Sequence, residues 1–193
     1  MAVAGSLVRV GRAVVAVVAL FVAACTTAPI VVDAPRDVSD LGTWQVNGRM
    51  AVSGAEGGGS GSFIWRQEGD RSDVQLRGPL GVGSLRLTLD GEALRIETAD
   101  GQALEAEDAQ AELKARLGAS VPTAALRYWL LGRAAPGQHR LEATEQAAVL
   151  EQGGWHIDFQ RFGVTGGARL PMRWVAVNGP AKVRVIVDKW QLK

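Results

Sequence analysis

The sequence predicts a mainly β domain with α-helices, of the α+β class, built on a strongly curved antiparallel sheet. About ten or eleven short segments alternate apolar and polar residues, which is the pattern of strands with one buried face. Short turn signals join many of these segments, so neighbouring strands are expected to run antiparallel. Two or three helical segments accompany them, and we expect these helices against the concave face of the sheet. Such a sheet either fills its own interior or encloses an apolar cavity.

The N-terminal 24 residues predict a lipoprotein signal peptide. Arg9 and Arg12 lead into an apolar run over residues 13–24. This run is shorter than the about 20 residues of a membrane-spanning helix and is typical of a signal peptide. Cys25, the only cysteine in the chain, directly follows two alanines at the end of the run, as in a bacterial lipobox. We expect cleavage before Cys25 and acylation of that residue. The alternative is an ordinary cleaved signal with a cysteine nearby by chance.

Residues 25–40 are expected to be the lipidated cysteine and a tether, followed by a single domain over residues 41–193. The tether carries Pro29 and Pro35, and Thr26 in place of an aspartate is permissive for the outer membrane. One cysteine cannot form an internal disulfide, so the exported domain depends on its core. The leader holds two of the 21 basic residues and none of the 20 acidic ones, which leaves the mature body a net charge near −1. This balance gives no electrostatic case for nucleic-acid binding.

Five strands are expected in the first part of the domain. The alternating segments are residues 44–52, 62–67, 72–78, 84–90 and 93–98. Glycine fills much of 54–61, which predicts a flexible hairpin loop. A turn is expected at 78–81, and Asp90-Gly91 is a strong tight-turn signal. Together these segments predict an antiparallel meander.

Helical patterns follow the meander. Asp108 is expected to cap a helix that runs to about Leu117, with Gly118 as its stop signal. A second helix is expected within residues 120–131, and its apolar stripe consists of Leu126, Trp129 and Leu130. A short helical turn is expected at 37–41.

The C-terminal part returns to strand patterns. Strands are expected at residues 147–151, 155–159, 170–177 and 182–190. Residues 137–152 are otherwise ambiguous. A loop is expected at 163–169, and Asn178-Gly179 is a hairpin signal.

Catalytic, metal-binding and cofactor motifs are absent from the sequence. His139 and His156 are its only histidines, and His156 lies on the polar face of its predicted strand. Two distant histidines and one acylated cysteine do not form a zinc site. The glycines of 54–61 match neither a Walker A nor a dinucleotide-binding pattern, and no serine lies in a nucleophile elbow. We therefore expect no enzyme activity, no catalytic residues, no metal and no cofactor.

The unusual features that remain are apolar. Six Trp residues stand beside one Tyr and four Phe, and the simplest interpretation of each Trp is a place in the core. Leu80 differs, because it lies between Pro79 and Gly81 at a predicted hairpin tip. It either folds back on the sheet or is exposed toward a membrane or a ligand.

Several short motifs occur in a fixed order after the lipobox. They are Trp44-x-x-x-Gly48-Arg49, Phe63-x-Trp65-x-Gln67, Gly78-Pro79-Leu80-Gly81, Pro122 to Leu126, Trp129-Leu130-x-Gly132, Gly154-Trp155, Leu170-Pro171 and Trp190. In this order and spacing, over about residues 40–193, the chain resembles the LolB family of outer-membrane lipoprotein receptors. Two stretches depart from the family's pattern: the glycine-rich segment 54–61, and residues 133–137, which are longer than the family's helix-exit turn.

The resemblance implies an unclosed antiparallel β-barrel of about 11 strands, with a helical lid over an apolar cavity. It implies a lipid-anchored receptor on the periplasmic face of the bacterial outer membrane. Such a receptor accepts lipoproteins from the periplasmic carrier LolA and inserts them into the inner leaflet of that membrane. The implied partners are LolA, lipoprotein cargo and outer-membrane phospholipid, and the protein is expected to be a monomer.

The resemblance also assigns roles to individual residues. Cys25 is the lipid anchor, and Leu80 is the protruding leucine that the family uses in membrane insertion. The acyl-chain cavity is expected to be lined by Phe63, Trp65, Leu85, Leu87, Trp129 and Trp155. The alternatives are an accessory lipoprotein for envelope structure or assembly that binds no acyl chain, and an envelope enzyme. The soluble carrier itself is the rival within the same fold, and the lipobox argues against it.

Overall fold

The computed structural model describes residues 37–55, 57–79, 83–144 and 146–193. The chain divides into two units, 1–33 and 34–193, and all described residues belong to the second. The expected leader, Cys25 and Leu80 lie outside the described residues. All core residues of the structure fall between Leu41 and Trp190. A chain that begins at residue 26 therefore retains every described contact that holds this domain together.

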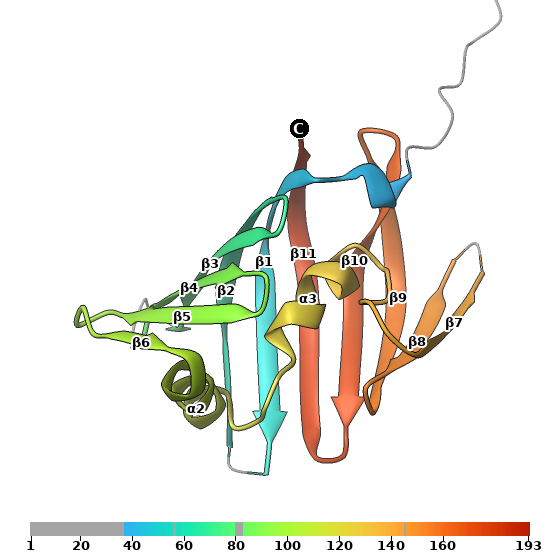
Figure 1. Ribbon diagram of the computed structural model, residues 1–193. Helices are drawn as coiled ribbons and strands as arrows, with labels where there is room; N and C mark the ends of the chain where they lie inside the picture. The colour runs from blue at the N-terminus through green and yellow to red at the C-terminus, as the bar shows by residue number, and fades with distance from the viewer. Residues whose placement is uncertain (1–36, 56, 80–82, 145) are drawn as a thin grey trace, which may run out of the picture. The chain divides into compact units, whose positions relative to one another are not determined.

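The described residues contain eleven strands in one antiparallel sheet (Figure 1). The strands are β1 Thr43–Gly54, β2 Gly57–Glu68, β3 Arg71–Arg77, β4 Leu85–Asp90, β5 Ala93–Thr98, β6 Ala103–Glu105, β7 His139–Ala143, β8 Ala148–Gln152, β9 Trp155–Thr165, β10 Ala168–Asn178 and β11 Ala181–Leu192. Their order is β6-β5-β4-β3-β2-β1-β11-β10-β9-β8-β7. The first and last strands of the chain thus lie side by side at the centre. β6 and β7 are the edges of a sheet that does not close, which confirms the predicted unclosed antiparallel fold.

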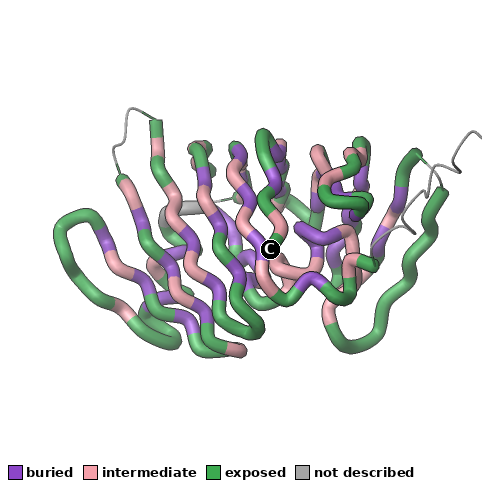
Figure 2. The backbone as a smooth tube through the Cα atoms, turned by 90° about the horizontal axis from the view of Figure 1, so that it is seen from above, coloured by how far each residue is buried: buried purple, intermediate pink, exposed green. Residues whose placement is uncertain are grey.

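The alternation predicted along the strands is present. In β4, the leucines at 85, 87 and 89 are buried while Arg86 is exposed. Figure 2 shows buried and exposed residues alternating along the other strands as well. The buried residues gather on one face of the sheet, and the helices cover that face (Figure 1).

Three helical segments accompany the sheet in the described residues: the 3-10 turn η1 Val38–Asp40, α2 Ala106–Leu117 and α3 Thr123–Leu130. The turn predicted at 37–41 is confirmed. Ser39 N donates to Asp37 at 2.8 Å, and this backbone hydrogen bond lowers the pKa of the Asp37 carboxyl. No helix in the described ranges has the length and apolar character needed to cross a membrane.

The predicted N-cap of α2 was wrong by three residues, since Glu105 and not Asp108 precedes the helix. The helix begins at Ala106, and Asp108 lies inside its first turn, where a carboxylate stabilises the positive end of the helix. Its predicted end is correct, because Gly118 adopts a left-handed φ of 70°. The helix α2 contacts β2 and β5, so it covers one side of the concave face.

Two predicted loops are largely strand. Gly57 to Gly61 belong to β2, where Gly59 and Gly61 pair with Val52 and Met50 of β1. Pairing with a long neighbouring strand outweighs the weak strand propensity of glycine. In the second loop, β9 and β10 continue to a two-residue turn at 166–167, and both of these glycines have positive φ. Because this two-residue turn joins β9 and β10 directly, the longer loop expected at 163–169 does not form.

The ambiguous stretch 137–152 contains β7 and β8, and the strand predicted at 147–151 is β8. All five residues of β7 are exposed, which leaves no buried face to produce a clear alternation. An edge strand with such a pattern cannot be recognised from hydrophobic periodicity.

An apolar cavity beneath the helices

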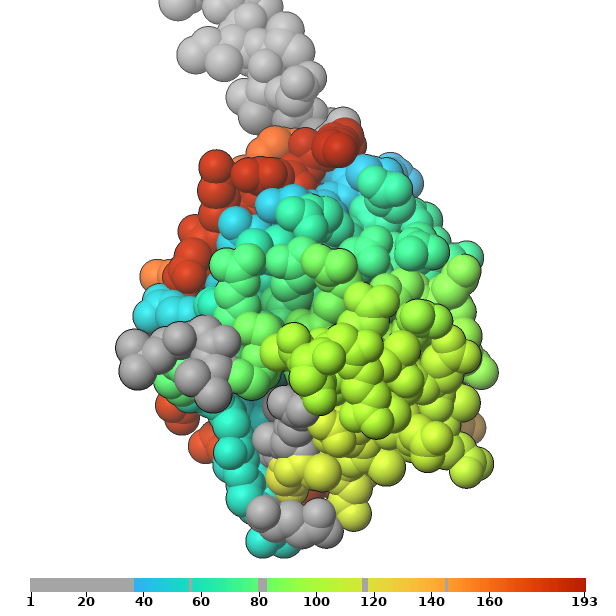
Figure 3. Space-filling view, turned by 90° about the vertical axis from the view of Figure 1, so that its left-hand side faces the viewer, coloured from blue at the N-terminus to red at the C-terminus, as the bar shows by residue number. Residues whose placement is uncertain are grey.

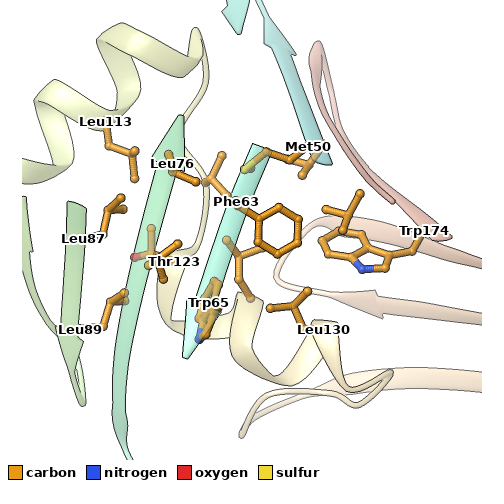
Figure 4. Close-up of a pocket in the computed structure, with 15 residues that line it drawn as sticks. Met50, Phe63, Trp65, Leu76, Leu87, Leu89, Leu113, Thr123, Leu130 and Trp174 are labelled. Carbon is orange, nitrogen blue, oxygen red and sulfur yellow. The ribbon is translucent and has the colours of Figure 1, made fainter. Parts of the chain in front are cut away.

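A small cavity lies between the concave face of the sheet and the two helices (Figure 4). Strands β1 to β4, β10 and β11 supply one wall. The opposite wall comes from Leu113 of α2, Val121 and Thr123 before and at the start of α3, and Leu126 and Leu130 within it. Two members of the apolar stripe predicted on the second helix, Leu126 and Leu130, therefore face the cavity.

The cavity is nearly filled by its own lining. Its volume is about 50 Å³, which is room for about one or two water molecules. No polar atom exposes surface to the cavity, although Thr123 and two tryptophans are among the residues that line it. The structure therefore shows a closed form in which the side chains of α3 occupy the space above the sheet.

Three of the six predicted cavity residues line this cavity. Phe63, Trp65 and Leu87 project into it from β2 and β4. Leu85 is buried but lines an adjoining groove instead. These four share one face of the sheet because they alternate with polar residues, as the sequence indicates.

The other two predicted cavity residues pack against each other beside β8. The ring centroids of Trp129 and Trp155 are 5.9 Å apart. Trp129 Nε1 donates to Gln152 Oε1 at 3.2 Å, and the Gln152 side chain also bonds the backbone N and O of Ala135. Neither ring is part of the cavity lining in this closed form.

The residues that close the cavity from above or from the C-terminal strands were not predicted as cavity residues from the sequence. Leu126 and Leu130 were predicted only as part of the apolar stripe of their helix, from their i, i+4 spacing. Met50 and Val185 lie on predicted apolar strand faces. Trp174, inside a predicted strand, gave no signal to separate it from ordinary core tryptophans.

A larger groove adjoins the cavity at the end of β1 and β2. Its volume is about 670 Å³, and Met50 and Leu76 line both spaces. Backbone of Gly58 to Ser62 forms one side of the groove, and Leu85 forms part of the other. Figure 3 looks onto the side of the domain where β2, β3 and β4 carry these residues. The side chains of Met50 and Leu76 thus belong to both the cavity and the groove.

A buried polar network supports the cavity wall at Trp65. Trp65 Nε1 donates to Gln67 Oε1 at 2.9 Å, and Ser72 Oγ donates to the same oxygen at 2.6 Å. Gln67 Nε2 in turn donates to the carbonyl oxygen of Gly69 at 2.8 Å. Because each of these groups has a partner, the network fixes the indole of Trp65 in one orientation.

None of the described residues that line the cavity is charged. Arg49 pairs with Asp188 at 3.0 Å and Arg95 with Glu105 at 2.6 Å, and all four side chains are at least half exposed. In the described part of the chain, no three His, Cys, Asp or Glu residues cluster as a metal site requires. The arrangement is suited to removing apolar groups from water.

Known proteins are related to this chain in sequence. Residues 42–190 match the family model described as outer membrane lipoprotein LolB. The outer-membrane lipoprotein LolB of Alkalilimnicola ehrlichii is 36% identical over 197 residues, which cover 95% of this chain and 98% of the relative. Its counterparts in Ectopseudomonas mendocina and Pseudomonas aeruginosa are 31% and 33% identical over 159 residues, which cover 81% of this chain and 78% of each relative.

Among solved structures, a LolA superfamily protein from Nitrosomonas europaea has the same fold. The match has a TM-score of 0.50 at 12% sequence identity and covers 80% of this chain and 87% of that chain. At this identity the likeness concerns the fold alone. The family match and the sequence relatives carry the assignment: the chain belongs to the LolB family of outer-membrane lipoproteins.

Proposed function

We propose that this protein is an outer-membrane lipoprotein receptor. It accepts lipoproteins from the periplasmic carrier LolA, holds their acyl chains in the apolar cavity and inserts them into the inner leaflet of the outer membrane. Membership of the LolB family supports this role. The single observation that carries it is the apolar cavity closed by α3.

The cavity suits a cargo that cannot cross water alone. Burial of an acyl chain stabilises the complex by about 25 cal/mol for each Å² of apolar surface removed from water. Transfer then requires only a better apolar environment at each step and no covalent chemistry. We therefore assign no enzyme activity to this chain.

Binding requires the cavity to open. A volume of about 50 Å³ holds no acyl chain, so α3 and the side chains beneath it must move. This helix has only eight residues. It is followed by Gly132, whose left-handed φ of 74° marks a change of chain direction. We propose that α3 is the lid and that Leu126 and Leu130 leave the sheet when cargo enters.

The anchor and the domain boundaries follow from the sequence. Residues 1–24 are the signal peptide, Cys25 carries the acyl chains, residues 25–40 form the tether, and 41–193 form the receptor domain. More than one acyl chain on Cys25 makes anchoring to the outer membrane stable, with the domain facing the periplasm. Mass spectrometry of the mature N-terminus tests this assignment, and an unmodified Cys25 or cleavage elsewhere contradicts it.

Leu80 is proposed to act in membrane insertion. One exposed leucine gains at most about 1.5–3 kcal/mol on burial, which perturbs a leaflet but does not anchor a protein. Leu80→Glu is expected to accept lipoprotein normally and to fail in depositing it. The matched control is Leu141→Glu, an exposed leucine of β7 with 44% of its surface accessible. Normal deposition by Leu80→Glu contradicts the role.

Transfer between purified components tests the proposed function as a whole. LolA loaded with a labelled lipoprotein is mixed with residues 26–193 of this chain, and the location of the label is followed. The label is expected to move to this chain as a one-to-one complex of monomers. Phospholipid vesicles are then expected to take it up. No movement from an active carrier would favour an accessory lipoprotein that binds no acyl chain.

A further inference from the structure

One buried hydrogen-bond donor at the cavity has no partner. Trp174 lies in the middle of β10 and is 0% exposed, and its indole ring is part of the cavity lining. Its ring nitrogen forms no hydrogen bond within the described part of the chain. Figure 4 labels Trp174 among the residues around this cavity. The indole is therefore one of the side chains that line the closed cavity, where its nitrogen exposes no surface.

Other buried indoles in the described part of the chain do have polar partners. Three of them donate from Nε1: Trp65 to Gln67 Oε1 at 2.9 Å, Trp129 to Gln152 Oε1 at 3.2 Å and Trp190 to the carbonyl oxygen of Pro171 at 3.2 Å. Burying a donor without an acceptor costs free energy, so native proteins pair such groups. In a position lined by aliphatic and aromatic side chains, a phenylalanine would avoid this cost. The unpaired N–H requires an explanation.

We propose that Trp174 Nε1–H is a subsite for a carbonyl oxygen at the head of a bound acyl chain. An acyl chain brings one acceptor into the cavity, the oxygen of its ester or amide linkage. The Trp174 N–H would donate a hydrogen bond to this oxygen and thereby fix how deeply the acyl chain enters. The apolar lining would surround the hydrocarbon. This inference rests on the proposed function, because it concerns the same cavity.

The neighbours of Trp174 suit a positioning role. The ring is held by Phe159 of β9, with centroids 6.5 Å apart, and the residue pairs with Val185 in the register of β10 and β11. The indole thus belongs to the rigid sheet rather than to the mobile lid. A donor fixed on the sheet defines one position for the carbonyl whatever path α3 follows.

A trapped water is the competing explanation for the unpaired donor. The cavity has room for about one or two water molecules. A buried water needs two to four polar partners, and the lining of the cavity exposes no polar atom to a water within it. If a water were the partner of the Trp174 donor, the protein would bind ester and ether lipids equally well. A carbonyl subsite would instead favour the ester lipid.

Two lipopeptides that share one peptide sequence test the proposal. One carries palmitoyl chains in ester linkage, and the other carries hexadecyl chains in ether linkage, which lack the carbonyl oxygens. Residues 26–193 are expected to bind the ester form roughly threefold to tenfold more tightly, the range of one hydrogen bond. Trp174→Phe is expected to abolish this preference and to leave binding of the ether form nearly unchanged. Trp190→Phe, which alters a buried indole outside the cavity lining, is the matched control and is expected to retain the preference.

The indole proton provides a second readout in the unaltered protein. Its NMR resonance, assigned by its loss in Trp174→Phe, is expected to move downfield with the ester lipopeptide and not with the ether form. Equal affinity of the unaltered protein for both lipopeptides, or a preference that persists in Trp174→Phe, would overturn the subsite. Failure of both lipopeptides to bind would instead overturn the proposed function itself.

Discussion

Gly48 lies directly opposite Phe63 across β1 and β2, and a Cβ atom at Gly48 would stand 2.8 Å from Phe63 Cε1. The same Cβ would collide with the carbonyl oxygen of Ile186 on β11. The missing side chain thus makes room for an aromatic ring that lines the cavity. This relationship explains why the apolar face of β1 is interrupted by glycine at this position.

Gly48→Ala is expected to destabilise the domain. The new methyl group must displace either Phe63 or the backbone of β11, and overpacking of this kind costs about 1–3 kcal/mol. Urea unfolding of residues 26–193 measures the change. Gly42→Ala is the control, since a Cβ at Gly42 meets nothing within 4 Å. Equal stability of the two variants would contradict the packing described for Phe63.

Leu126→Asp is expected to abolish acceptance of lipoprotein. Leu126 is half-buried on α3 and lines the cavity, so the variant places a charge where the acyl chain binds. Burying an unpaired carboxylate against hydrocarbon is unfavourable, and the affinity for cargo should fall more than tenfold. Ala124→Asp makes the same change on the exposed side of α3 and should retain acceptance. The transfer assay from loaded LolA measures both, and similar activity would exclude α3 as the lid.

Arg161→Glu is expected to stabilise the domain slightly. Arg161 and Arg173 are directly opposed across β9 and β10, and like charges in this position are destabilising. Neither arginine forms an ion pair with a described residue. The substitution should raise the free energy of unfolding by up to about 0.5 kcal/mol, measured by denaturant titration. The gain should shrink at high salt and should exceed that of Arg161→Ser. A gain independent of salt would point to another cause.

Gln152→Ala is expected to destabilise the segment that follows α3. The Gln152 side chain accepts from Trp129 Nε1 and from the backbone N of Ala135, and it donates to the Ala135 carbonyl oxygen at 2.7 Å. Its loss leaves several half-buried groups unpaired, at a cost of about 1–3 kcal/mol. Amide hydrogen exchange should accelerate in residues 133–137. Gln160→Ala, which removes an exposed side chain, should leave exchange there unchanged.

Much of this fold follows from local patterns. Alternation in β4 and β5 and the turn at Asp90-Gly91 predict the meander, since each buried face leaves its mark on the sequence. The order of short motifs predicts the family, which the family match confirms. The glycine-rich start of β2 could not be predicted as strand, because its pairing with β1 depends on tertiary structure and not on glycine's own propensity.

The site was predictable only in part. Phe63, Trp65 and Leu87 line the cavity because strand alternation fixes which face they occupy. Trp129 and Trp155 also face inward, but they lie in another part of the core. Alternation shows which face of the sheet a residue occupies and does not show which part of the core that residue reaches. The unpaired donor of Trp174 could not be foreseen, since it depends on which acceptors the folded chain brings within reach.

Photocrosslinking tests the central claim, that the closed cavity opens to receive an acyl chain, most directly. A lipopeptide whose palmitoyl chain carries a diazirine is bound to residues 26–193 and irradiated, and the adducts are mapped by mass spectrometry. Adducts are expected on residues that face the cavity from both the sheet and the lid, among them Met50, Phe63, Leu126 and Leu130. Adducts confined to the outer face of the sheet, with none on these residues, would contradict the account.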